Sequence, residues 1–215
     1  GMSDKTLSVT DKQASQHRFL GSGIEGLLHI ASSYSNRFNE VILSLPKGRR
    51  LQAITVSVNR GQTSIRQATL ENATIKTKGY HLRITESSIK NSTLTTPSII
   101  NIFDTELTDS QVKTEGGHIY AENIKVRGKV ELDSHNGLTL FLSKTEFDRI
   151  NLDMSSKHGG IYRKAYREHP RQKENELANP YKTEKADVKD LLIIKANQDI
   201  YLPKEEEYSA PPSNH

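Results

Sequence analysis

Residues 70–84 read LENATIKTKGYHLRI, residues 89–102 read IKNSTLTTPSIINI and residues 107–120 read LTDSQVKTEGGHIY. These are three copies of one pattern, which extends from Ala53 to Arg163: an alternating apolar and polar strand, a short turn and a second alternating strand. Self-similarity at roughly 20 residues is typical of a solenoid, in which each unit buries its apolar side against its neighbours. The repeat therefore predicts a solenoid.

The repeat places apolar residues at matching positions of successive units. The units are headed, at spacings of 19, 19, 18 and 18 residues, by Val56, Ile75, Leu94, Val112 and Val130. Because side chains alternate between the two faces of a strand, these positions are predicted to point inward and their polar neighbours outward. In three units, the residue three positions before the heading residue is Asn72, Asn91 or Asp109. Because the position is the same in each unit, these three side chains are predicted to stack.

Short turns close the units. They are predicted, from glycine that supplies positive φ or proline that presets φ, at Lys78-Gly79, Pro97-Ser98, Gly116-Gly117, Asn136-Gly137 and Gly159-Gly160. The chain is therefore predicted to be all-β: an elongated, right-handed β-helix-like solenoid with coils of about 18–20 residues. Little or no helix is expected outside 164–190.

The pattern also predicts how the chain is divided. Residues 1–16 are polar and without periodicity, and we expect a flexible lead-in. Residues 17–202 are predicted to form a single β-solenoid domain, which a charged insertion at 164–190 interrupts. Residues 190–202 return to the pattern as one more coil, interpreted as the cap, and residues 203–215 are a polar tail.

Composition narrows the class of protein. The 215 residues are 33% hydrophobic with a mean hydropathy of −0.66, which suits the narrow core of a solenoid. A net charge of +4 spread through the chain, with 6% aromatic residues, argues against a nucleic-acid-binding protein. There is no cysteine, which excludes disulfides, thiol nucleophiles and thiolate metal sites. No apolar run reaches the roughly 20 residues of a membrane helix.

Five segments appear in a recognisable order. The chain holds, one after another, VILSLPKG (41–48), ITVSVNRG (54–61), KTKGYHLRI (76–84), KTEGGHIYA (113–121) and ANQDIYL (196–202). Their order and spacing resemble a bacterial adhesin domain family, a β-solenoid domain of unknown function, over roughly residues 24–202. The chain departs from the family pattern in the 164–190 insertion and at Pro97-Ser98, where a glycine turn is usual.

The resemblance implies a location and a kind of function. It implies a β-helix-like domain on the outer face of Gram-positive membranes, behind an anchor, with no established enzymatic activity; "adhesin" is itself an inferred label. We therefore expect an extracellular or cell-surface location through an upstream anchor outside this chain. Gly1 precedes Met2, so Met2 is either the natural start or follows a trimmed anchor, and a natural start without an anchor would place the protein in the cytoplasm.

Two patterns suggest cofactor or metal chemistry. Gly21, Gly23 and Gly26 match the spacing of a dinucleotide-binding fingerprint, with Glu40 near the expected acidic position. That site needs a buried strand before it and a helix after it, and the HRFL segment is not interpreted as such a strand. Four histidines near the turns lack metal-ligand spacing and are interpreted as exposed turn residues: His81, His118, His135 and His158. No cofactor and no metal is expected.

Two enzyme classes also use solenoids. A polysaccharide lyase or glycosidase needs two carboxylates at a set separation, and the candidates are Asp104, Glu106, Asp109, Asp133, Asp148 and Asp153. This class is kept as the alternative function, although the chain has no tryptophan platform for sugar rings. A hexapeptide-repeat acyltransferase is disfavoured, because the apolar steps from Leu70 to Leu94 are 5, 7, 7 and 5 residues rather than six.

The densest charge feature is basic. Arg163, Lys164, Arg167 and Arg171 are candidate contacts to an anionic partner such as teichoic acid or lipid headgroups. The expected function is therefore a non-enzymatic cell-surface module, an adhesin or envelope-associated scaffold or binding protein. Its expected partner is a cell-envelope polymer or another surface protein.

Overall fold

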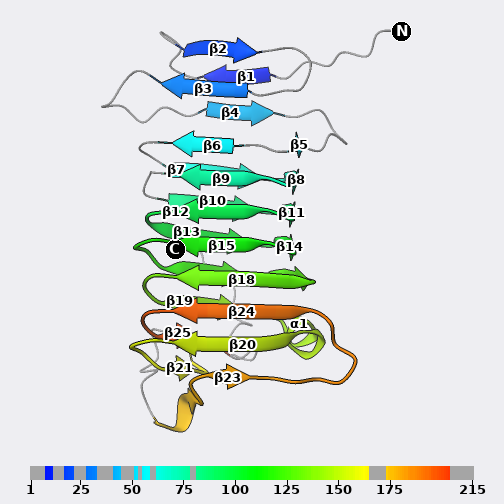
Figure 1. Cartoon of the computed structure of the whole chain (residues 1–215), viewed down its shortest axis with the longest axis vertical. Helices are drawn as coiled ribbons and strands as arrows, with labels where there is room; N and C mark the ends of the chain where they lie inside the picture. The colour runs from blue at the N-terminus through cyan, green and yellow to red at the C-terminus, as the bar shows by residue number, and fades with distance from the viewer. Residues whose placement is uncertain are drawn as a thin grey trace, which may run out of the picture.

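The computed structural model describes residues 62–77, 81–164 and 173–203, together with the backbone of strands at 8–11, 17–21, 28–32, 41–44, 51–52 and 55–58. Most of them form a parallel β-solenoid whose coils stack along one axis (Figure 1). Front strands run right to left and rear strands return left to right as the coils descend, which is a right-handed winding (Figure 1). The all-β, right-handed prediction is confirmed.

Three sheets make the sides of the coils. In spatial order, the front sheet contains β6 (Thr55–Val58), β9 (Thr74–Thr77), β12 (Thr93–Thr96), β15 (Gln111–Thr114), β18 (Lys129–Ser134), β24 (Leu191–Ala196), β20 (Asn151–Ser156) and β23 (Tyr181–Lys182). The rear sheet contains β7 (Gln62–Arg66), β10 (His81–Thr85), β13 (Ile99–Phe103), β16 (Ile119–Glu122), β19 (Leu138–Phe141), β25 (Ile200–Tyr201), β21 (Ile161–Tyr162) and β22 (Glu176–Leu177). The side sheet contains β5 (Leu51–Gln52), β8 (Thr69–Glu71), β11 (Ser88–Lys90), β14 (Glu106–Thr108) and β17 (Lys125–Arg127).

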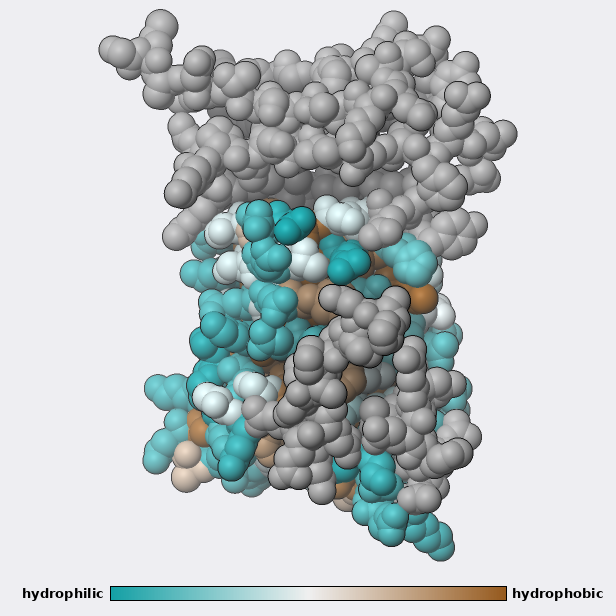
Figure 2. Space-filling view, turned by 180° about the vertical axis from the view of Figure 1, so that it is seen from behind, coloured by the Kyte–Doolittle hydropathy of each residue, from teal (hydrophilic) through white to brown (hydrophobic). Residues whose placement is uncertain are grey.

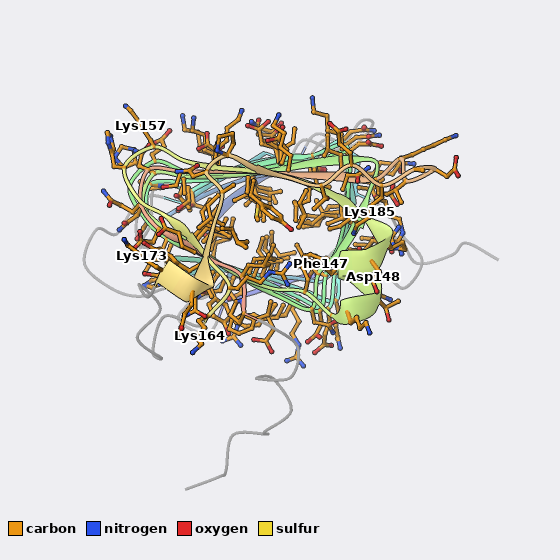
Figure 3. All side chains as sticks on the ribbon, turned by 90° about the horizontal axis from the view of Figure 1, so that it is seen from below. Phe147, Asp148, Lys157, Lys164, Lys173 and Lys185 are labelled. Atoms are coloured by element: carbon orange, nitrogen blue, oxygen red, sulfur yellow. The ribbon has the colours of Figure 1, made fainter. Side chains whose placement is uncertain are left out.

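Alternation along the strands produces the core. In β12, Leu94 is buried and Thr93 is exposed, and Leu94 pairs in register with Ile75 on one side and Val112 on the other. Side chains fill the space between the front and rear sheets when the molecule is seen from below (Figure 3). Each fully buried aliphatic side chain contributes about 1.5–3 kcal/mol, so the stacked apolar positions stabilise the coils as predicted.

The predicted register is wrong at one coil. Val112 pairs with Leu132, and Val130 pairs instead with Leu192. Val130 is buried as predicted, but it lies two residues before the position that stacks on Val112. A slip of two residues keeps every side chain on its own face, so apolar alternation alone does not distinguish Val130 from Leu132.

The corners on both sides of the side sheet use left-handed backbone conformations. Positive φ occurs there at Gln67, Glu86, Asp104 and Asn123 on one corner, and at Asn72, Asn91, Asp109 and Gly128 on the other. Asn and Asp adopt this conformation more readily than most residues. Asn72 N–H donates to Lys90 O and Asn91 N–H to Thr108 O, so the predicted stack exists, and its cause is the backbone bend.

Buried hydroxyls hold the same corners together. Ser92 Oγ donates to Lys90 O at 2.6 Å and accepts from Ala73 N at 3.0 Å. Ser92 N in turn donates to Ser110 Oγ of the next coil at 3.1 Å. These bonds satisfy backbone groups that the bend removes from the strand ladder.

The glycine turns have a different cause from the one predicted. Among the described glycines, positive φ is found at Gly128, whereas Gly117 and Gly137 do not have it. A Cβ on Gly117 would lie 2.2 Å from the backbone of Ser98 in the neighbouring coil, and one on Gly137 would lie 2.8 Å from Asp199 O. These turns need glycine because their backbones stack closely.

The first strands pair as antiparallel ribbons. β1 (Ser8–Asp11) pairs with β4 (Val41–Ser44), and β2 (His17–Gly21) pairs with β3 (Leu28–Ser32). The segment predicted to be a lead-in therefore contains a strand, and HRFL is a strand as well. The next described element after β2 is the antiparallel β3. Gly23, Gly26, Glu40 and Gly79 lie outside the described residues.

The last coil in the sequence is not the last coil of the solenoid. β24 pairs in parallel with β18 on one side and β20 on the other. β25 likewise lies between β19 and β21. The coil predicted to be the cap is therefore inserted between two coils that precede it in the sequence (Figure 1). That interpretation is wrong.

A short helix takes the place of a side-sheet strand after β19. α1 (Lys144–Arg149) begins at the N-cap Ser143, whose Oγ accepts from Glu146 N at 3.2 Å. Ser followed by Glu three residues later is a capping-box signature. α1 is the one α-helix in the described residues and has six residues, which agrees with the expectation of little or no helix outside 164–190. Within the insertion, η1 (Lys173–Asn175) is one 3₁₀ turn.

The described part of the insertion closes the end of the solenoid. β22 pairs antiparallel with β21, and β23 pairs antiparallel with β20. Asn179 fastens this segment, since its Nδ2 donates to Ser156 O at 2.8 Å and its Oδ1 accepts from Ser156 N at 3.0 Å. Covering the edge of a parallel sheet protects it from pairing with other chains, so the insertion is the cap.

Candidate anion-binding end of the solenoid

Three charged side chains close the end of the side sheet. Glu146 Oε1 accepts from Val126 N at 2.6 Å, while Arg149 Nη2 donates to Val126 O. Asp190 Oδ1 accepts from Gly128 N at 2.6 Å, and its other oxygen pairs with Arg149. These side chains give β17 hydrogen bonds that earlier side-sheet strands obtain from the next strand, so the sheet edge is satisfied.

Glu146 is buried within this network. Burial raises the pKa of Glu146, while the hydrogen bond from Val126 N and the charge of Arg127 act in the opposite direction. Its carboxylate is held by Val126 N and Arg149 at once. The arrangement makes Glu146 a structural carboxylate that completes the cap.

Phe147 lies between two cations at the same end. The Arg163 guanidinium is 5.0 Å and Lys185 Nζ is 4.8 Å from the centroid of its ring. Lys185 Nζ also donates to the carbonyls of Phe147 and Ile150 at the C-terminal end of α1. Cation–π contacts contribute about 0.5–1 kcal/mol each at exposed sites, and they position Arg163 on the cap.

Two lysines extend this basic end. Lys164 follows Arg163, and Lys173 begins η1. Seen from below, Lys164 and Lys173 project outward on the side of the end opposite α1 (Figure 3). Neither forms a hydrogen bond or an ion pair with another described residue. Of the four predicted residues, Arg163 and Lys164 are thus placed on the cap, and Arg167 and Arg171 lie outside the described residues.

Charges on the faces of the solenoid pair with each other. The ion pairs between strands include Lys90–Glu71, Lys113–Asp133, Lys195–Glu131 and Lys182–Asp153. Residues 163–173, by contrast, carry five cationic side chains and one carboxylate, a net charge of +4 that equals the net charge of the whole chain. Of this segment, Arg163, Lys164 and Lys173 are described, and all three lie at the capped end. Hydrophilic side chains dominate much of the described rear surface (Figure 2).

The six carboxylates considered for glycoside chemistry lie on different elements. Five of them have a cationic or N–H partner, and these partners are Asn123 for Asp104, Arg127 for Glu106, Lys129 N for Asp109, Lys113 for Asp133 and Lys182 for Asp153. Asp148 is exposed on α1. Asp104 and Glu106 line the same open depression, but Asn123 and Arg127 engage them.

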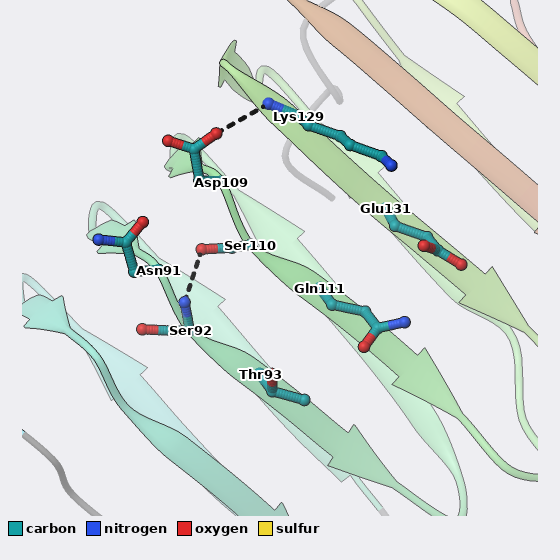
Figure 4. Close-up of a pocket in the computed structure, with 8 residues that line it drawn as sticks. All are labelled: Asn91, Ser92, Thr93, Asp109, Ser110, Gln111, Lys129 and Glu131. Carbon is teal, nitrogen blue, oxygen red and sulfur yellow. Dashed lines mark hydrogen bonds between the residues drawn. The ribbon is translucent and has the colours of Figure 1, made fainter.

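Another open depression lies along the corner between the side and front sheets (Figure 4). Its lining comprises Asn91, Ser92, Thr93, Asp109, Ser110, Gln111, Lys129 and Glu131. The polar groups at its base already bond to one another: Ser92 N donates to Ser110 Oγ, and Lys129 N donates to Asp109 Oδ1 at 3.0 Å. This depression is therefore part of the corner architecture.

The predicted turn histidines do not form a metal site with other described residues. No group of three His, Asp or Glu side chains within the described ranges could hold a metal ion. His135 and His158 are exposed as expected, and Asn197 lies beside both turns. His81 and His118 differ from the prediction, because both are partly buried: His81 is the first residue of β10, and His118 Nε2 lies 3.1 Å from Thr139 Oγ1. Burial lowers the pKa of His118 from its ordinary value of 6.5.

Stability is expected to fall on acidification because of His118. Its folded-state pKa lies below the unfolded value of 6.5, so the unfolded chain binds more protons in the window below that pH. The contribution is fully present above about pH 6.5 and is lost as pH falls through the lowered pKa. Urea unfolding at pH 5 to 8 should show a flatter pH dependence for His118→Asn than for wild type. The exposed control His135→Asn should keep the wild-type pH dependence of the unfolding free energy. The same pH dependence in His118→Asn would contradict the role given to His118.

Sequence reasoning missed several residues of this end. Phe147 and Lys185 were not predicted to take part, and Glu146 was not recognised as a cap. The capping-box spacing of Ser143 and Glu146 was the available signal for α1. Nothing local in the sequence connects Phe147 with Arg163 or Lys185, because the contact depends on how the insertion folds back.

Comparison with known proteins identifies the family. No helix in the described part of the chain is long and apolar enough to cross a membrane. No curated protein and no solved structure gives a significant match. A family model described as Toastrack DUF4097 matches residues 2–202, which include all the coils and the cap. The chain therefore belongs to the Toastrack family, DUF4097, a family of β-solenoid domains of unknown function.

Proposed function

We propose that this chain is a non-enzymatic, envelope-associated binding module displayed at the cell surface, which attaches to an anionic polymer through its basic end. The observation that carries this proposal is the charge distribution. Several cations on the faces pair with carboxylates of neighbouring coils, whereas residues 163–173 carry a sequence surplus of +4, and the described cations of that segment, Arg163, Lys164 and Lys173, lie at the capped end.

The chemistry of the basic end suits a phosphate-rich polymer. The guanidinium of Arg163 packs on the Phe147 ring, and the backbone N–H of Arg163 donates to Asn175 O at 2.8 Å. Guanidinium and ammonium groups bind phosphate through charge-assisted hydrogen bonds. Residues on a segment that a rigid scaffold supports often carry function. Teichoic acid is a phosphate-rich polymer of this kind and is the proposed partner, and the resemblance to cell-surface adhesin domains supports the location.

Neutralising the basic end should weaken attachment in a salt-sensitive way. The triple variant Arg163→Gln, Lys164→Gln, Lys173→Gln is expected to bind purified wall teichoic acid roughly a hundredfold more weakly at low salt, since each cation near an anionic surface contributes about 1 kcal/mol. The difference should shrink at high ionic strength because salt screens exposed charges. Isothermal titration calorimetry at several salt concentrations measures it.

A charge-matched control separates the basic end from net charge. Lys76, Lys125 and Lys129 are exposed on other faces, and their replacement by Gln makes the same change in net charge. Equal losses of affinity in the two triple variants would show that binding depends on overall charge. Unchanged affinity in the Arg163, Lys164 and Lys173 variant would exclude the basic end as the binding site. Release of reducing sugar ends from wall glycans by the wild-type protein would favour the alternative, a carbohydrate-active enzyme.

A further inference from the structure

The slot between two consecutive coils is filled by the end of the chain. β18 and β20 are consecutive front-sheet strands in the sequence, but they do not pair with each other. Each instead pairs in parallel with β24 over six residues. We call the space between β18–β19 and β20–β21 the slot, and residues 190–203 the C-terminal coil. Until the C-terminal coil is in the slot, the two facing strand edges have unpaired backbone groups.

The C-terminal coil is shaped to enter the slot from the side. It has a front strand, β24, and a rear strand, β25, and the described chain ends at Pro203 without a side-sheet strand. The side-sheet position at this end is closed by Glu146, Arg149 and Asp190. The coil is attached through residues 163–190 and has no side-sheet strand among the described residues, so β24 and β25 can enter the slot from the side.

The contacts that hold the C-terminal coil can form equally well when the coil comes from a second copy of the chain. Its inward side chains are 0–6% exposed, and they are Leu192, Ile194, Ala196, Ile200 and Leu202. Its outward Lys195 bonds to Glu131 at 2.8 Å, and its Asp190 bonds to Gly128 N. A second copy offers the same slot with the same partners. The cap residues 173–190 contact β20, β21 and α1 of the same end, so exchange of the cap and the C-terminal coil together conserves both sets of contacts.

We propose that the C-terminal coil exchanges between two copies of this chain, so that each copy fills the slot of the other and forms a dimer. The sequence order favours this outcome. The slot stays open until residues 190–203, which follow both of its walls in the sequence, are available, and at high concentration the C-terminal coil of a second copy competes with the chain's own coil for it.

Register-matched cysteines test the exchange. Asp133 and Lys195 are paired residues of β18 and β24, and neighbouring strands lie about 4.8 Å apart, within the Cα range of a disulfide. The full chain has no cysteine, so single variants are unambiguous. Asp133→Cys and Lys195→Cys chains of different mass tags are unfolded together, refolded at high concentration and oxidised. The control pairs Asp133→Cys with Lys76→Cys, which lies on the same face away from β24.

The expected result is a covalent heterodimer with Lys195→Cys and little with Lys76→Cys. The double variant Asp133→Cys, Lys195→Cys, oxidised as a monomer, should form an internal disulfide and refold without dimerising. Equal heterodimer yields with Lys195→Cys and Lys76→Cys would overturn the proposal, as would dimerisation of the locked monomer to the same extent as wild type.

Discussion

Leu94→Asp is expected to destabilise the protein by about 4 kcal/mol or more, because it places an unpaired charge in the core. Leu94 is 0% exposed and stacks between Ile75 and Val112 in the neighbouring coils. A domain of ordinary stability has about 5–15 kcal/mol in total, so this single change removes a large part of it. Chemical denaturation followed by far-ultraviolet circular dichroism measures the loss.

Thr93→Asp is the matched control for that variant. Thr93 precedes Leu94 in β12 and is exposed on the outer face of the front sheet. A carboxylate there stays in water, so the change is expected to lie within about 0.5 kcal/mol of wild type. Similar losses in the two variants would mean that the assignment of inward and outward faces is wrong.

Glu146→Ala is expected to cost about 1–3 kcal/mol, because it leaves the buried Val126 N–H without an acceptor and removes one of the two carboxylates that bind Arg149. Glu146 is 6% exposed, and its loss leaves Val126 N without its carboxylate and Arg149 without its neighbour on α1. The end of the side sheet would then be open. Thermal and urea unfolding of the variant measure the loss.

Two further variants isolate the role of the carboxylate. Glu146→Gln keeps an acceptor for Val126 N but removes the charge that pairs with Arg149, so an intermediate loss is expected. Asp148→Ala changes an exposed carboxylate on the same helix and is expected to be close to neutral. If Glu146→Ala behaved like Asp148→Ala, the network would not be closing the side sheet.

Period-two patterns predicted the parts of the fold that depend on one coil and its nearest neighbours. The inward positions of Ile75, Leu94 and Val112, and the stack of Asn72 and Asn91, all follow from local alternation. The same pattern misplaced Val130, because Val130 and Leu132 face the same side of one strand. Glycine was predicted at the turns for the wrong reason, since close approach of Gly117 to Ser98 depends on the neighbouring coil.

The order of the coils was not predictable from local patterns. Residues 190–202 carry the same strand–turn–strand signal as any other coil, and nothing in them specifies that β24 lies between β18 and β20. The sequence also did not predict that α1 takes a side-sheet position or that the cap strands β22 and β23 pair with the outer edges of β21 and β20. Their positions result from long-range packing.

The basic end was partly visible in the sequence. The run beginning at Arg163 stood out by charge alone, and Arg163 and Lys164 are indeed on the cap. Charge did not reveal that Phe147 fixes Arg163 or that Lys185 binds the end of α1, because those partners are brought together by the fold.

Methyl nuclear Overhauser effects to Ile194 test the central claim, that the final coil lies inside the stack. Ile194 pairs with Leu132 on one side and with Met154 on the other. In the monomer at low concentration, cross-peaks are expected from the Ile194 methyl to both Leu132 and Met154, and none between Leu132 and Met154 directly. A direct Leu132–Met154 cross-peak, with none from Leu132 to Ile194, would show that the coils stack in sequence order and would contradict the account.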